Sequence, residues 1–109
     1  MSASTSRLAY QDCFTLFERA NEEPLGIKFR CETFSFATYF RLRLNKARSI
    51  DREDNALAYD SDHPMHGRSV YDDISITVRN GAAGAWIIME KISSRKFEIV
   101  SLTEEDDLL

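Results

Sequence analysis

Apolar residues recur at steps of three and four positions near the start of the chain, from about Arg7 to Asn21. The residues with this spacing are Ala9, Cys13, Leu16, Phe17 and Ala20. Such a pattern predicts an amphipathic helix with one apolar face. Ser6 is placed to cap its start, and Pro24 predicts its end because proline disfavours helical geometry in the residue before it.

The pattern then changes period twice. Residues 27–32 alternate apolar and charged side chains, which predicts a strand with one face on a core and one face in solvent. Helical spacing returns from Phe34 to about Ile50, with Thr33 as the expected N-cap. The apolar stripe of this second helix is formed by Phe36, Ala37, Phe40, Leu44 and Ala47.

The last third of the chain predicts three further strands, after a polar and irregular connection over residues 54–72. Residues 74–79 alternate, Asn80 and Gly81 begin a turn, and residues 86–92 are apolar on both faces, as expected of a central strand. Residues 96–102 predict an edge strand.

The resulting order α-β-α-β-β-β predicts an α+β fold, with two helices packed on one face of a small, mainly antiparallel sheet. A length of 109 residues suits one domain, which we place at residues 1–102 and follow with an acidic, disordered C-terminal tail at 103–109. The expected core contains Phe14, Phe17, Phe36, Phe40, Leu44, Ile76 and Trp86.

Charge is distributed unevenly along the chain. The net charge is −4, and the four acids Glu104, Glu105, Asp106 and Asp107 account for it. The predicted domain itself is therefore neutral, which argues against strong nonspecific binding to DNA through bulk charge.

One side of the second predicted helix is polar and basic, and arginine suits phosphate recognition. Lys28 and Arg30 on the outward face of the preceding strand extend this basic surface, while Tyr39 or Tyr71 is suited to stack on an unpaired base. The predicted nucleic-acid-binding residues are Lys28, Arg30, Tyr39, Arg41, Asn45, Arg48 and Arg52. The alternative is a solvated helix face whose arginines pair with neighbouring acids.

Residues suited to catalysis or metal binding are few. His63 and His66 form a single His-x-x-His pair without the second ligand pair that zinc spacing requires. Cys13 and Cys31 occupy apolar positions, as expected of reduced core residues in a cytoplasmic protein. The longest uncharged apolar run is too short to span a membrane. We therefore expect no enzyme activity, no metal and no cofactor.

The segment Thr103–Leu109 resembles the acidic, hydrophobic-ended C-termini of bacterial and phage single-stranded-DNA-binding proteins. Those termini recruit partner proteins and compete with nucleic acid for a basic surface. The resemblance implies that Glu104, Glu105, Asp106 and Asp107 bind protein. The alternative is a terminus that only increases solubility.

A wider resemblance covers most of the chain. Pro24-Leu-Gly-Ile27 before a strand, residues 39–48 on a helix, and Ser69-Val-Tyr-Asp-Asp73 before another strand are similar to small accessory proteins of tailed bacteriophages. Members with an understood role bind nucleic acid, polymerase or defence complexes without catalysis.

Two hypotheses follow. The first is a phage-type accessory protein that associates with nucleic acid, with single-stranded DNA as the candidate ligand, or with a nucleoprotein complex. It does so through the basic helix and is modulated by the acidic tail. The second is an inhibitor or adaptor that acts on a host polymerase, nuclease or defence complex through the acidic loop and tail. Exposed Leu42 and the predicted edge strand near Phe97 also favour a homodimer.

Overall fold

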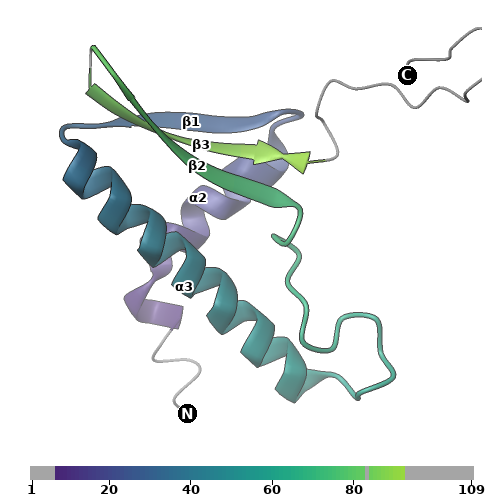
Figure 1. The fold of residues 1–109 in the computed structure, drawn as a ribbon. Coiled ribbons are helices and arrows are strands. Elements are labelled where there is room, and N and C mark those ends of the chain that lie inside the picture. The colour runs from purple at the N-terminus through teal and green to yellow at the C-terminus, as the bar shows by residue number, and fades with distance from the viewer. Residues whose placement is uncertain (1–6, 83, 93–109) are drawn as a thin grey trace, which may run out of the picture.

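The computed structural model describes residues 7–82 and 84–92. A helical turn at residues 7–9 precedes α2 (Gln11–Glu22), which is followed by β1 (Gly26–Cys31), α3 (Phe34–Ala58), β2 (Ile74–Gly81) and β3 (Gly84–Lys91) (Figure 1). The α+β class is confirmed. The predicted strand at 96–102 and the acidic tail lie outside the described residues.

The three strands form one antiparallel sheet in the order β1-β3-β2. The central position predicted for the strand after the turn is confirmed, because β3 pairs with both neighbours. Its register places Trp86 between Arg30 of β1 and Arg79 of β2. Since side chains alternate along a strand, directly paired residues share one face of the sheet.

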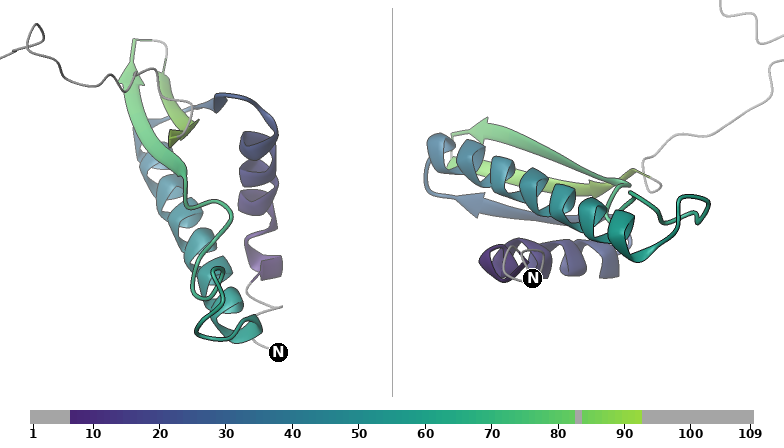
Figure 2. Two further views of the ribbon diagram at one scale, coloured as in Figure 1. Left: turned by 90° about the vertical axis from the view of Figure 1, so that its right-hand side faces the viewer. Right: turned by 90° about the horizontal axis from the view of Figure 1, so that it is seen from below.

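Both helices pack on the same face of this sheet. In Figure 2 (right), which views the molecule from below, α3 crosses in front of the strands and α2 lies beside it. The strand residues that face the helices include Ala85, Ile87 and Met89 of β3, all fully buried. Cys13 and Phe17 from α2 join Ala37, Phe40 and Leu44 from α3 in the same hydrophobic core.

The predicted core was wrong at two positions. Phe36 is 49% exposed on α3, and Trp86 points to the face of the sheet opposite the helices, where it is only partly buried. The run around Trp86 is apolar on both faces of its strand, which favours a strand buried on both sides. In the described residues, however, helices cover only one face of the sheet.

Helix α3 begins as predicted and ends eight residues later than predicted. The side chain of Thr33 accepts a hydrogen bond from the backbone N–H of Phe36 at 3.0 Å, which confirms the N-cap. The helix continues past Ile50 because polar contacts replace the apolar stripe. Buried Asp51 accepts hydrogen bonds from Arg7 at 2.9 Å and from the hydroxyl of Ser69 at 2.6 Å. Among the described helices, none is long and apolar enough to cross a membrane.

The connection between α3 and β2 is anchored at its C-terminal end. Tyr71 is buried, its ring stacks on Phe17 with centroids 4.8 Å apart, and its hydroxyl donates to Glu18 at 2.7 Å. The backbone N–H of Tyr71 also donates to the hydroxyl of Ser69. Tyr71 is therefore a core residue that fixes the entry to β2, and its ring is not at the surface to stack on a base.

Candidate nucleic-acid interface

The guanidinium of Arg48 is used inside the protein. It donates to the backbone carbonyls of Tyr71 at 2.8 Å and Ile74 at 2.5 Å, and to the side-chain oxygen of Asn45 at 3.2 Å. Burial, with repulsion from Arg52, lowers the pKa of Arg48 from its ordinary value. The side chain nevertheless stays charged at neutral pH, since arginine titrates far above it. Arg48 thus fastens the start of β2 to α3.

The other predicted nucleic-acid-binding residues of α3 either contact the protein or face solvent. Arg52 forms an ion pair with Asp72 at 2.6 Å. Asn45 accepts the Arg48 bond, Arg41 is partly buried, and Tyr39 is 54% exposed. That arginines of this helix contact phosphates stays a prediction. The structure gives Arg48 and Arg52 other partners, so a phosphate would have to compete with those contacts.

Replacing Arg48 by methionine is expected to lower the free energy of unfolding by about 2–3 kcal/mol, because the carbonyls of Tyr71 and Ile74 lose a charged donor. Arg41→Met, the same change on the same helix, should stay within about 1 kcal/mol, since no described residue bonds to Arg41. Urea unfolding followed by circular dichroism measures both. Equal losses in the two variants would contradict the anchoring role of Arg48.

Among the described residues, three unpaired cations lie together on the sheet. We call the side of the sheet opposite the helices the open sheet face. Its members are Lys28, Arg30, Ser75, Thr77, Arg79, Trp86, Ile88 and Glu90. Lys28, Arg30 and Arg79 are exposed, and none of the three forms an ion pair with a described carboxylate. No described element covers this face.

Trp86 lies at the centre of these cations. Arg30 and Arg79 are its direct cross-strand partners, one on each side. The ammonium of Lys28 lies 5.0 Å from the centroid of the indole ring, which is a cation–π contact. The result is an aromatic ring flanked by three positive charges, none of which is paired with a described carboxylate.

Sequence reasoning found half of this arrangement. Lys28 and Arg30 were predicted, because they alternate with apolar residues in β1. Arg79 and Trp86 were missed. Arg79 alternates in the same way after Val78, so that signal was present in the sequence. Trp86 was assigned to the core because both faces of its strand are apolar, and only the packing shows which face the helices cover.

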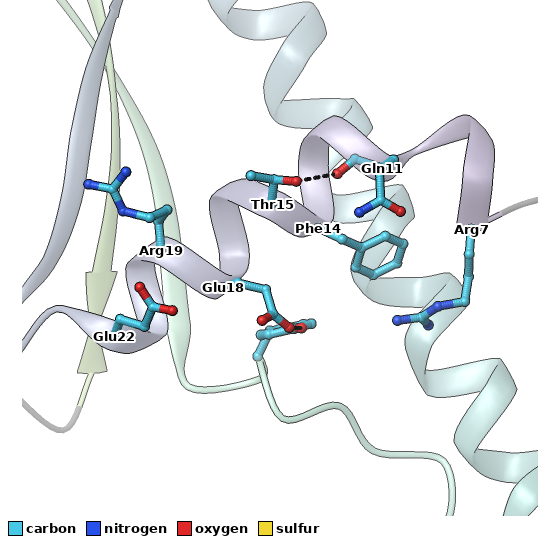
Figure 3. A pocket seen from close by; sticks show the side chains of 8 residues that line it. Arg7, Gln11, Phe14, Thr15, Glu18, Arg19 and Glu22 are labelled. Carbon is cyan, nitrogen blue, oxygen red and sulfur yellow. Dashed lines mark hydrogen bonds between the residues drawn. The ribbon is translucent and has the colours of Figure 1, made fainter.

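A surface hollow of about 390 Å³ lies between the N-terminal helical residues and Tyr71 (Figure 3). Several of the polar groups that line it have partners within the protein. Thr15 donates to the carbonyl of Gln11 at 3.0 Å, and the Tyr71 hydroxyl donates to Glu18. Burial and the bond to Glu18 raise the pKa of Tyr71, so the phenol is protonated at neutral pH and cannot serve as a base. The arrangement serves to join α2 to the loop before β2.

The thiols and histidines show no arrangement suited to chemistry among the described residues. Cys13 and Cys31 are free and buried, and burial raises the pKa of Cys13 to about 11, which keeps it from acting as a nucleophile. His63 stacks on Tyr59, and its Nδ1 accepts from the backbone of Met65. Nδ1 of His66 contacts the carbonyl of Tyr59 at 2.8 Å. Within residues 7–82 and 84–92, no cluster of three metal-ligating side chains occurs.

Comparison of this chain with protein-family models, with curated proteins and with solved structures found no match.

Proposed function

We propose that this protein binds single-stranded nucleic acid without catalysis, and that it does so through the open sheet face. The observation that carries the proposal is the row Arg30–Trp86–Arg79 with Lys28 over the ring. Aromatic rings that stack bases, combined with cations that follow the phosphates, are the common means of binding single strands. Arg48 and Arg52 of α3 are bound to other parts of the protein, so this proposal moves the interface from α3 to the sheet.

An unpaired strand fits this face better than a duplex. A base must leave the stack of a double helix before it can lie on a protein ring, and single strands present such bases without that cost. Three cations also give a modest phosphate attraction, and duplex binding through the backbone alone commonly uses more phosphate contacts. Stacking on Trp86 therefore supplies much of the binding free energy in this proposal, and it requires the Lys28 ammonium to move off the ring toward a phosphate.

The acidic tail completes the proposal. Glu104, Glu105, Asp106 and Asp107 carry four negative charges, which complement the cations of the open sheet face. The tail then weakens binding by competing with phosphates at low salt, where charges interact over longer distances. This gives a regulated accessory protein of the phage type that the sequence resembles.

The test is fluorescence anisotropy on a labelled single strand at several salt concentrations. Three phosphate contacts should give a slope of log affinity against log salt of about −2, from roughly 0.7 per contact. Deleting residues 104–109 should strengthen binding, most clearly at low salt. Absence of binding at low salt by both the intact and truncated proteins would refute the proposed function, and an unchanged affinity on truncation would refute the role of the tail alone.

A second candidate function is protein binding, in keeping with an adaptor or inhibitor. Phe36, Tyr39 and Leu42 are 49%, 54% and 60% exposed at three-residue spacing on α3. Exposed apolar side chains that lie together favour a protein contact, with a second copy of the chain or with another protein. Capture from a host lysate with and without nuclease separates the two functions: a partner that survives nuclease, and is lost when Tyr39 and Leu42 become serine, favours this candidate.

A further inference from the structure

We infer that Glu90 reads a guanine in the bound strand, an inference that rests on the proposed function and assigns it a base preference. Among the described residues of the open sheet face, Glu90 is the one acid. A carboxylate on a surface that attracts phosphates lowers the affinity for any nucleic acid. Glu90 would instead favour binding if its carboxylate accepts hydrogen bonds from donors on the ligand.

The neighbours of Glu90 leave its carboxylate accessible. Its cross-strand partners are small: Gly26 on β1 has no side chain, and Ser75 on β2 has a short one. The Ser75 hydroxyl bonds to the backbone carbonyl of Glu90 at 3.4 Å and not to its side chain. The carboxylate forms no ion pair with a described cation. A side chain at position 26 is excluded by geometry, since a Cβ there would clash with the carbonyl oxygen of Met89.

A shallow hollow of about 560 Å³ lies beside this carboxylate. Ile88 contributes apolar surface to it, Lys28 and Arg79 line it from the two outer strands, and Glu90 lines it too. An apolar surface, two cations and one acceptor match a nucleotide: a flat base, a phosphate, and donors on the edge of the base. Trp86 and Glu90 are four residues apart on β3, or about 14 Å, which leaves room for one nucleotide between the stacked base and the base that is read.

The chemistry of the acceptor selects the base. An ionised carboxylate only accepts hydrogen bonds, and two adjacent donors satisfy both of its oxygens. Guanine presents such a pair on its Watson–Crick edge, N1–H and the N2 amino group. Cytosine and adenine present one amino group beside an acceptor, and thymine and uracil present one N–H between two carbonyls. Unpaired bases are commonly recognised on this edge.

The experiment compares short thymidine strands that carry one central guanosine, inosine, adenosine or cytidine, with uridine strands as the RNA counterpart. Inosine is the matched ligand, because it lacks only the N2 amino group. The intact protein should bind the guanosine strand about tenfold more tightly than the inosine or adenosine strand. Glu90→Gln keeps the size of the side chain but removes the charge, and should bind all strands alike, with an affinity for plain thymidine at least equal to that of the intact protein.

The outcomes distinguish this inference from the proposed function. Binding of every strand with equal affinity by the intact protein would overturn the reading of guanine and leave the proposed function standing. A guanosine preference that persists in Glu90→Gln would overturn the role of Glu90. Absence of binding to any strand would refute both. The inosine comparison needs no variant, so the inference remains testable even if Glu90→Gln is unstable.

Discussion

Phe40→Ala is expected to lower the free energy of unfolding by about 3–5 kcal/mol, the usual loss for a buried phenylalanine. Phe40 is 9% exposed and lies where α3 meets the sheet. Its ring packs edge-on against Phe29 of β1 with centroids 5.9 Å apart. Truncation would leave a cavity between the helix and the strand that surrounding side chains cannot fill without shifting.

Phe36→Ala is the matched control, because it is the same change one turn earlier on the same helix. Phe36 is half-exposed and its ring stacks on that of Phe40, so its loss should cost about 1–2 kcal/mol, clearly less than the loss of Phe40. Urea unfolding measures the free energy of unfolding of both variants, which can be compared directly if the slope against urea concentration is the same. Equal costs would mean that Phe40 is not a core residue, and would contradict the orientation of α3 against the sheet.

Reversing two charges of the open sheet face, Arg30→Glu with Arg79→Glu, is expected to abolish binding to single strands. Both guanidiniums flank Trp86, so the change places two negative charges beside the ring on which a base would stack. Two of three predicted phosphate contacts disappear, and like-charge repulsion is added. Fluorescence anisotropy at low salt measures the loss.

The matched control for this variant is Arg41→Glu with Lys46→Glu on α3, which changes the net charge by the same amount. If the interface is on the sheet, the helix variant should keep most of the affinity. Thermal unfolding must show that both variants remain folded. Loss of binding in the helix variant alone would return the interface to α3 and contradict the proposal.

The fold was predictable where periodicity is local. The alternation of Ile27 to Glu32 predicted β1 at close to its observed bounds, and the helical stripe ending at Ala47 predicted where α3 begins. The extension of α3 to Ala58 was not predictable, because it depends on Arg7 and Ser69, which are distant in the sequence and meet Asp51 only in the folded protein. Pairings between distant residues leave no periodic signal.

The candidate interface was predictable in part for the same reason. A polar stripe on a helix has two interpretations, solvent contact or internal contact, and the sequence does not distinguish them. Arg48 illustrates this, since its partners are backbone carbonyls that any residue provides. Trp86 illustrates the reverse: an apolar residue on an apolar strand, whose position on the open sheet face follows only from the side on which the helices pack.

The strand order β1-β3-β2 has a consequence for how this protein acquires its proposed interface. The strands β2 and β3 are adjacent in sequence and can pair early, but β1 is separated from β3 by the whole of α3 and the following loop. Such distant pairing closes a long loop and tends to be slow. We therefore expect Trp86 and Arg79 to come together with the hairpin, and Lys28 and Arg30 to join them only when β1 pairs with β3. A chain in which β1 has not yet paired with β3 presents an aromatic ring and a single cation. A ligand that needs all three cations would therefore bind the folded protein and not the partly folded chain.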